Sequence, residues 1–236
     1  MASVCVTGGT GYVGQRLVSA LLARGHRVRV LTREASASRV PSGAEAVIGD
    51  ALKASSYAQM LQSGDTLVHL VGTPHPSPAK AAEFRRVALP SIEAAVEAAQ
   101  RAGLAHLIYV SVAHPAPVMK AYIEVRTAGE TLLANARLTA TVLRPWYVLG
   151  PGHRWPIALV PIYWLARRVP STRAGATRLG LVTLRQMVAA LVRAVEDSPD
   201  PGTQQFWEVP EIRNAELWPQ GSSRPDEDLS RRRSRG

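Results

Sequence analysis

Short runs of apolar, largely β-branched residues alternate through the first two thirds of the chain with stretches in which apolar residues recur every three or four positions. Continuous apolar runs are typical of buried strands, and the wider spacing is typical of helices that pack one face on a sheet. The pattern therefore predicts strands at 4–7, 28–32, 45–48, 65–72, 106–112, 139–143 and 205–209, and helices after residue 12, at 83–102, at 120–135 and from 184.

Alternation of strands and helices predicts an α/β fold, a doubly wound parallel sheet with helices on both faces (Rossmann fold). The strict alternation lapses after a Gly-Pro-Gly sequence at 150–152. We therefore expect a core at 1–150 and a small substrate-side subdomain at 151–213 that completes the same domain. Residues 214–236 are polar and charged, which predicts a disordered tail. Pro90 lies inside the predicted helix 83–102 and is expected to kink it.

The first predicted strand runs directly into a glycine-rich turn, Thr-Gly-Gly-Thr-Gly-Tyr-Val-Gly at 7–14. Gly8 lets the chain turn, Gly11 lets backbone approach a ligand, and Gly14 lets the following helix pack close to the strand. The start of a helix offers N–H groups and a positive dipole end to phosphates. This order of strand, turn and helix predicts a cradle for the pyrophosphate of a dinucleotide. No Gly-Lys-Ser/Thr follows, so a triphosphatase P-loop is not supported.

The end of the second predicted strand indicates which nicotinamide dinucleotide is bound. An acidic residue there would bind the ribose 2′-hydroxyl of NAD, whereas an arginine accommodates the 2′-phosphate of NADP. No Asp or Glu occupies 30–33, and Arg33 is present, with Arg16 and Arg39 available to assist. NADP(H) is therefore favoured over NAD(H). The alternative is that Arg33 is simply a solvated surface residue.

Composition excludes several other classes of protein. The net charge is +10, and 25 of the 28 basic residues are arginines, but they are scattered, so no nucleic-acid partner is expected. The single cysteine, Cys5, rules out an internal disulfide framework and is expected to be buried and inert. The six histidines lack zinc-ligand spacing, so no metal is expected. The glycine turn lies too close to Met1 for a signal peptide, which predicts a cytoplasmic protein.

The segment 155–166 is the most apolar part of the chain and contains two prolines. Twelve residues are too few to span a bilayer as a helix, which needs about 20. With arginines at 154, 167 and 168, the segment 155–168 suits peripheral contact with a membrane surface. The alternative is a pocket wall or core element, which would favour an apolar small-molecule substrate.

Three polar residues are candidates for catalysis. Ser111 lies at the carboxyl end of a predicted strand, where parallel sheets present ligand sites. Tyr122 and Arg126 lie four residues apart on the next predicted helix and so share a face. A nearby cation favours the ionised form of a tyrosine, which would let Tyr122 pass a proton, and a serine hydroxyl would hold the substrate oxygen. The trio would protonate a carbonyl while a nicotinamide delivers hydride.

The glycine turn, the loop after the fourth strand and Thr-Val-Leu-Arg-Pro at 141–145 resemble the short-chain dehydrogenase/reductase superfamily, over residues 3 to 210. Within it the chain is most similar to the atypical, NmrA-like branch, which includes relatives of a mitochondrial complex I accessory subunit. The resemblance implies a bound dinucleotide with Asp50 near the adenine and Gly72 near the nicotinamide-side ribose. The predicted cofactor contacts are Thr7, Gly8, Gly9, Thr10, Gly11, Tyr12, Val13, Gly14, Arg33, Asp50, Ala51, Val71, Gly72 and Thr73.

The chain departs from the superfamily's Tyr-x-x-x-Lys signature because Arg126 stands at the lysine position after Tyr122. Arginine keeps the charge but has a different shape. Two functions therefore remain open. One is an NADP(H)-dependent oxidoreductase that acts on an apolar carbonyl compound. The other is a non-catalytic dinucleotide-binding protein, either a redox sensor or a membrane- or quinone-associated assembly factor.

Overall fold

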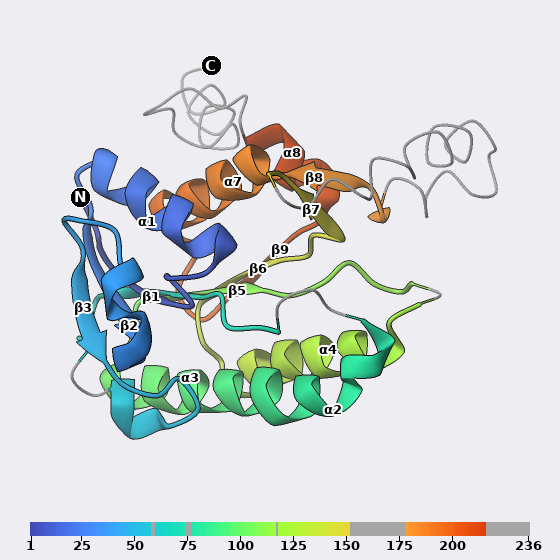
Figure 1. The fold of residues 1–236 in the computed structure, drawn as a ribbon, viewed down its shortest axis with the longest axis horizontal. Coiled ribbons are helices and arrows are strands. Elements are labelled where there is room, and N and C mark those ends of the chain that lie inside the picture. The colour runs from blue at the N-terminus through green and yellow to red at the C-terminus, as the bar shows by residue number, and fades with distance from the viewer. Residues whose placement is uncertain (58–59, 74–76, 117, 152–177, 216–236) are drawn as a thin grey trace, which may run out of the picture.

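Seven strands form a parallel sheet that lies between two layers of helices (Figure 1). A computed structural model describes residues 1–57, 60–73, 77–116, 118–151 and 178–215. The sheet has the strand order β3-β2-β1-β4-β5-β6-β9, and every neighbouring pair is parallel. Its strands are β1 (Ser3–Thr7), β2 (Arg27–Thr32), β3 (Glu45–Ile48), β4 (Thr66–His69), β5 (His106–Val110), β6 (Ala140–Leu143) and β9 (Gln204–Trp207).

The order of the strands creates a switch point between β1 and β4. From β1 the chain moves outward to β2 and β3, then returns to β4 on the other side of β1 and continues outward to β9. Connections therefore leave β1 and β4 in opposite directions, which opens a crevice at their carboxyl ends. The prediction of a doubly wound α/β fold is confirmed.

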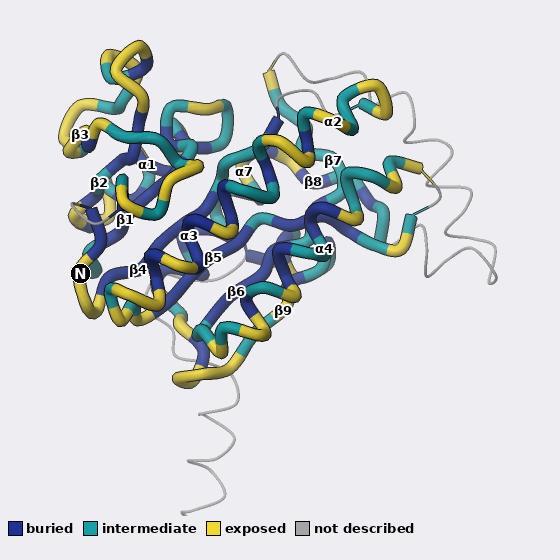
Figure 2. Tube along the Cα trace, turned by 90° about the horizontal axis from the view of Figure 1, so that it is seen from below, coloured by how far each residue is buried: buried dark blue, intermediate teal, exposed yellow. Residues whose placement is uncertain are grey.

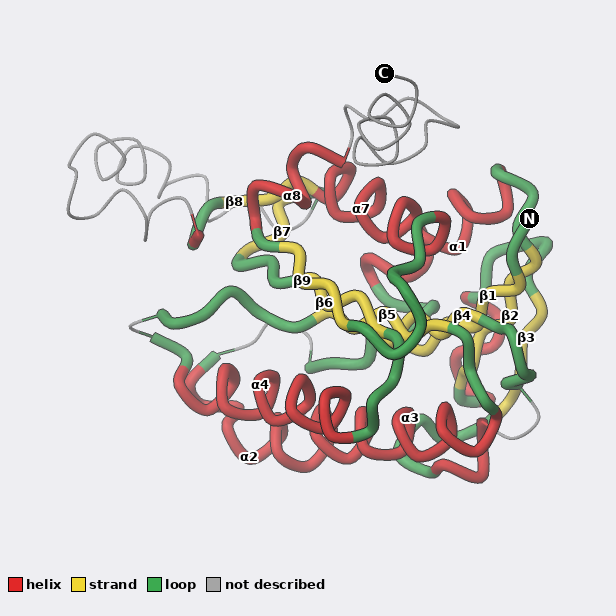
Figure 3. Tube along the Cα trace, turned by 180° about the vertical axis from the view of Figure 1, so that it is seen from behind, coloured by secondary structure: helices red, strands yellow, loops and turns green. Residues whose placement is uncertain are grey.

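Helices on the two faces bury two separate apolar clusters. Helices α1 (Tyr12–Ala23), α7 (Leu184–Glu196) and α8 (Val209–Asn214) cover one face, and α3 (Leu89–Ala102) and α4 (Lys120–Asn135) cover the other (Figures 1 and 3). Figure 2 shows the central strands buried and the outward sides of α3 and α4 exposed. Such burial on both faces explains the continuous apolar runs of the central strands.

Two local predictions are confirmed in detail. Helix α4 spans the predicted residues 120–135. Helix α7 begins at Leu184, as predicted, after a capping box in which the Gln186 backbone N–H donates to Thr183 Oγ1 at 3.1 Å and the Thr183 N–H donates to Gln186 Oε1 at 2.9 Å. These bonds satisfy two N–H groups that a helix start leaves without intrahelical partners.

Pro90 changes the helix in which it lies. The chain passes from α2 (Ala81–Glu83) through a π-helical turn, η4 (Phe84–Ala88), into α3, and Pro90 falls in the first turn of α3. Proline has no N–H to donate to the carbonyl four residues earlier, and its ring crowds that carbonyl. The wider π turn immediately before it relieves this crowding. It occurs where the sequence predicts a kink.

Some parts of the fold were not predicted. Strands β7 (Tyr147–Leu149) and β8 (Leu181–Thr183) pair in parallel as a second sheet, and α8 is a short additional helix. The apolar segment 155–168 and residues 216–236 of the predicted tail lie outside the described residues. No helix in the described part of the chain combines the length and the apolar character needed to cross a membrane.

Two buried histidines lie in the central strands. His69 Nδ1 lies 3.0 Å from Thr7 Oγ1, and His69 Nε2 lies 3.2 Å from Ser91 Oγ. Because Ser91 donates its own hydrogen to the Ala88 carbonyl, Nε2 of His69 must carry the hydrogen and Nδ1 must accept from Thr7. Burial, with a smaller effect of Arg126, lowers the pKa of His69 to about 3. Burial likewise lowers the pKa of His106 to about 4, against a smaller opposing effect of Asp197.

These pKa values predict that the folded protein loses stability in mild acid. Below the ordinary histidine pKa of 6.5 the unfolded chain protonates both histidines while the folded chain does not. The free energy of unfolding should therefore fall as the pH falls, by up to about 2.7 kcal/mol per pH unit for two protons. Urea denaturation at pH values between about 7.5 and about 5 measures this slope.

The His69→Gln variant separates one histidine from the other groups that titrate. Glutamine can still donate to Ser91 but does not titrate, so the slope should decrease by about one proton, or ~1.4 kcal/mol per pH unit. An unchanged slope in this variant would show that His69 is not held neutral in the folded state.

Candidate functional site

The glycine turn after β1 has no room for a side chain at Gly8 or at Gly14. Gly8 has a φ of +73°, a left-handed conformation, and a Cβ there would lie 2.9 Å from the Leu70 backbone. The Gly11 N–H donates to the Gly8 carbonyl at 3.0 Å and closes the turn. A Cβ on Gly14 would collide with the Gly8 oxygen and with Gly9. The first turn of α1 is therefore pressed directly against the turn that precedes it.

The start of α1 has the properties of an anion site. Gly11 is its N-cap, no side chain caps it, and the first turn contains no acidic residue. The Gln15 N–H donates to the Gly11 carbonyl at 3.1 Å, so the preceding N–H groups are those that a helix leaves without intrahelical acceptors. Among the described residues, a Cβ on Gly11 would meet only the Gly8 oxygen within 4 Å. This open backbone fits a dinucleotide's pyrophosphate.

The end of β2 lies beside the first turns of α1. Arg33 follows β2 and is exposed, and the 3₁₀ turn η1 (Glu34–Arg39) comes next. Gln15 Nε2 of α1 donates to the Arg39 carbonyl at 3.3 Å, which docks η1 against that helix. The Arg39 side chain itself donates to Ser36 at 2.6 Å. The structure therefore brings Arg33 and Arg39 to the edge of the sheet that carries the glycine turn.

The predicted adenine contacts lie in a braced loop after β3. The Asp50 side chain accepts from the Leu52 N–H at 3.0 Å, and the Asp50 N–H donates to Ser56 Oγ at 3.0 Å. The Tyr57 hydroxyl donates to the Ala51 carbonyl at 3.1 Å. Burial raises the pKa of Tyr57, with a smaller contribution from Asp50, so it remains a neutral donor. Asp50 and Ala51 thus lie at the same carboxyl edge as Arg33.

Arg126 makes hydrogen bonds to the loop after β4, residues 71–73. Both Nη atoms of Arg126 donate to the Val71 carbonyl at 3.3 Å. Thr73 is 7% exposed, and its hydroxyl has no hydrogen-bond partner within the described residues. A buried hydroxyl of this kind is costly unless a ligand or water satisfies it. The site therefore has an available hydroxyl beside the switch point, where a dinucleotide would lie.

The side chains of Tyr122 and Arg126 are in contact, as their spacing predicts. The Arg126 guanidinium carbon lies 5.2 Å from the centre of the Tyr122 ring and 5.7 Å from that of Tyr109. Phe84 of the π turn also packs against Tyr122, with ring centres 5.0 Å apart. Burial lowers the pKa of Arg126, but the two nearby tyrosines together raise it by more than burial lowers it. The pKa therefore lies above its ordinary value. Arg126 is therefore a permanent buried cation.

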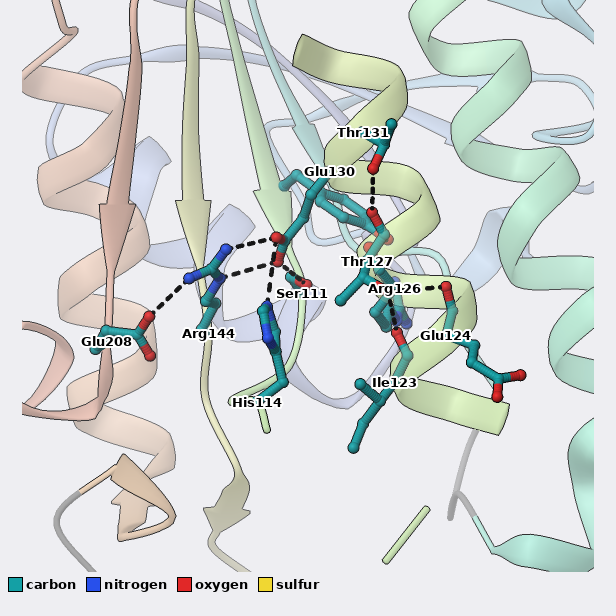
Figure 4. Close-up of polar contacts among 11 residues, drawn as sticks. Ser111, His114, Ile123, Glu124, Arg126, Thr127, Glu130, Thr131, Arg144 and Glu208 are labelled. Atoms are coloured by element: carbon teal, nitrogen blue, oxygen red, sulfur yellow. Dashed lines mark hydrogen bonds and ion pairs between the residues drawn. The ribbon is translucent and has the colours of Figure 1, made fainter. Parts of the chain in front are cut away.

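Ser111 is held by a buried carboxylate. Its hydroxyl donates to Glu130 Oε1 at 2.5 Å, and Ser111 is only 2% exposed (Figure 4). Sequence patterns did not predict Glu130 as a site residue, although a carboxylate on the inner face of a helix is a signal that could have found it. A serine has one hydrogen to donate. In this arrangement Ser111 therefore has none to offer to a substrate oxygen.

Glu130 belongs to a partly buried ionic network at the ends of β5, β6 and β9. Arg144 donates to both Glu130 oxygens, at 3.0 and 2.6 Å, and to Glu208 at 2.9 Å (Figure 4). His114 Nε2 lies 3.5 Å from Glu130. Burial lowers the pKa of Arg144, but its bonds to the two carboxylates raise it above the ordinary value. The network joins α4 to the start of α8 and fixes the surroundings of Ser111.

Two other kinds of site were considered, a metal site and a reactive cysteine. The part of the chain that the structure describes contains no group of three or more His, Cys, Asp or Glu residues arranged to hold a metal ion. Cys5 is buried in β1, as predicted, and burial raises its pKa to about 12. It is therefore an unreactive thiol.

Comparisons with known proteins agree with the cradle and the fold. A sequence model of the family described as NAD(P)H-binding matches residues 8–154. The chain is 29% identical to a ceramide reductase of Caulobacter vibrioides over 80% of its own length and 59% of that protein. It is 29% identical to a 3-diazoavenalumate denitrifying reductase of Streptomyces over 85% and 78% of the two chains. It is 30% identical to a farnesyl-dihydroquinoline-oxide ketoreductase of Stigmatella aurantiaca over 61% and 50%.

Solved structures share the fold. The Bordetella bronchiseptica enzyme WbmH in complex with NAD+ superimposes with a TM-score of 0.65 at 18% identity, over 88% of this chain and 75% of that one. A Thermus thermophilus UDP-glucose 4-epimerase in complex with NAD gives a TM-score of 0.63 at 20% identity, over 89% and 81%. The family match covers more than half of the chain and includes all four glycines of the turn. The chain therefore belongs to the NAD(P)H-binding family.

Proposed function

We propose that the protein is an NADP(H)-dependent reductase that transfers hydride to the carbonyl group of an apolar small molecule. The observation that carries the proposal is the geometry of one sheet edge. The glycine turn of β1, the loop after β4 and Tyr122 with its arginine all lie at the carboxyl ends of the central strands. An edge of this kind is where open α/β sheets bind nucleotides and place their chemistry.

Tyr122 is the proposed proton donor. A bound nicotinamide would supply the hydride, and the Tyr122 hydroxyl would give its proton to the carbonyl oxygen. The Arg126 guanidinium stacks 5.2 Å from the Tyr122 ring and keeps a positive charge beside it. This charge favours the negative charge that the tyrosine develops as it releases its proton. Ser111, whose hydrogen is bound by Glu130, would accept a hydrogen bond from the alcohol product rather than donate one to the ketone.

Arg33 supports the preference for NADP(H). It is exposed at the end of β2, where the adenosine ribose would lie, and the strand end carries no acidic residue. Asp50 and Ala51 would border the adenine. A guanidinium recognises a phosphate with paired, charge-assisted hydrogen bonds. A 2′-phosphate would therefore be attracted here, whereas NAD(H) would lack that interaction.

The names of two relatives support an apolar substrate. One is called a ceramide reductase and another is a ketoreductase of a farnesyl-bearing quinoline oxide, so both act on molecules with long hydrocarbon parts. This chain spans 59% and 50% of those proteins. We therefore transfer the chemical class, a carbonyl compound with a large apolar part, and not the individual substrates.

A second candidate function is nucleotide binding without catalysis. Two observations favour it: the Arg126 bonds are directed to main-chain oxygens, and the Ser111 hydrogen is held by Glu130. A protein built in this way could bind the dinucleotide and report the redox state or assist assembly. The first function requires turnover of some carbonyl compound, whereas the second requires binding alone.

The coenzyme preference can be tested with the Arg33→Glu variant. Loss of a charge-assisted contact with phosphate should raise the Kd for NADPH by about 10- to 100-fold and change the Kd for NADH much less. Fluorescence titration of the bound nicotinamide measures both constants. Arg27→Glu, at the exposed amino end of the same strand, is the matched control and should bind like the wild type. Equal losses in both variants would mean that Arg33 contributes only to the general charge.

Tyr122→Phe tests the catalytic proposal. Removal of a general acid should lower kcat by about 10²- to 10⁴-fold, while the Kd for NADPH stays the same. The assay follows NADPH oxidation with a panel of long-chain ketones, aldehydes and quinones. If wild-type activity persists in the variant, Tyr122 is not the proton donor. If the wild type binds NADPH but reduces no member of the panel, the non-catalytic function is favoured.

A further inference from the structure

Arg126 is a buried cation that bridges two strand ends instead of facing open space. Its Nη1 donates to the Val110 carbonyl at 3.2 Å and to the Val71 carbonyl at 3.3 Å, and its Nη2 donates to Val71 at 3.3 Å. The side chain projects from α4, so one guanidinium ties together the loop after β4, the end of β5 and a helix. Tyr109 and Tyr122 stack against it. Its Nε has no partner among the described residues.

The Arg126 side chain occupies the space that a side chain at position 72 would need. Gly72 is not among the glycines with a left-handed φ, so an alanine could adopt its backbone conformation. A Cβ on Gly72 would collide with Nη2 of Arg126 and lie 3.6 Å from its Cζ, and it would meet no other non-neighbouring atom of the described residues within 4 Å. Within the described part of the chain, the Arg126 side chain is therefore what requires glycine at this position. A shorter side chain at 126 would remove that requirement.

We propose that Arg126 is a latch, a positioning residue that fixes the loop 71–73 and thereby shapes the nicotinamide end of the nucleotide cleft. The inference rests on the proposed nucleotide binding, but it holds for either candidate function. By fixing the Val71 carbonyl, the latch sets the position of Thr73, whose buried hydroxyl has no partner within the described part of the chain. That hydroxyl suits a ribose hydroxyl or the carboxamide of nicotinamide, each of which can donate and accept.

A lysine would not serve as this latch. The guanidinium is a planar fork that reaches two carbonyls at once, whereas an ammonium is a single point at the end of a shorter side chain. Arg126 therefore does not contact the ligand directly. It makes the loop that contacts the ligand more rigid. The loop, and not the cation, would then meet the coenzyme.

A double-mutant cycle tests the latch with two probes. NADPH spans the whole cleft, whereas adenosine 2′,5′-bisphosphate occupies only the adenosine half. Gly72→Ala and Arg126→Lys should each raise the Kd for NADPH at least about tenfold, since each displaces charge-assisted hydrogen bonds. Neither should change the Kd for the bisphosphate. The double variant should bind NADPH no more weakly than Arg126→Lys alone, because lysine leaves room for the alanine.

Three results would overturn the latch. They are wild-type NADPH affinity in Gly72→Ala, additive losses in the double variant, and equal losses for both probes, which would indicate a general effect on folding. Arg86→Lys, exposed in η4, is the matched control and should bind both probes like the wild type. If the wild type binds neither probe, the proposed function itself fails.

Amide hydrogen exchange tests the latch without nucleotide. The Gly72 and Thr73 amides should exchange at least about tenfold faster in Arg126→Lys than in the wild type, since a loosened loop opens more often. Amides of the distant helix α7 should be unchanged. Unchanged rates at 72 and 73 would overturn the latch whether or not the protein binds nucleotide.

Discussion

The contact between the Gly8 carbonyl and Gly14 is the constraint on which the rest of the site depends. No side chain fits at Gly14, because a Cβ there would overlap the preceding turn. The first turn of α1 can therefore lie directly against the end of β1, and no side chain caps its first N–H groups. Everything proposed for the site follows from that placement, since a pyrophosphate held there sets the direction in which the nicotinamide must extend.

Near the carboxyl ends of the central strands, polar side chains are paired with one another or with main-chain carbonyls. His69 accepts from Thr7 at the end of β1, and Arg126 holds the Val71 carbonyl after β4. Glu130 and Arg144 pair between α4 and β6. Buried polar groups of this kind are costly unless they are paired, and paired they fix one arrangement. The protein thus has paired polar side chains around the ends of β1, β4 and β6, and we propose that the glycine backbone and the Thr73 hydroxyl contact the nucleotide.

The sequence predicts the features that depend on neighbouring residues. The glycine turn, helix 120–135 and the capping box at Thr183 are encoded within a few positions, so periodicity and turn chemistry are sufficient to find them. The pairing of β7 with β8 joins segments more than thirty residues apart, and each strand has only three residues. Such a short, non-local pair leaves no periodic signal.

The same distinction applies to the site. The spacing of Tyr122 and Arg126 predicts that they share a helix face, but their sequence does not show that the arginine turns toward Val71. The Glu130–Arg144 pair likewise could not be predicted from the sequence, because it forms only when α4 packs beside the end of β6. The most direct test of the central claim is an NMR titration of ¹⁵N-labelled protein with NADPH. We expect the largest amide shifts at Gly9, Gly11 and Gly14, whereas unchanged amides in the glycine turn at saturating NADPH would contradict the account.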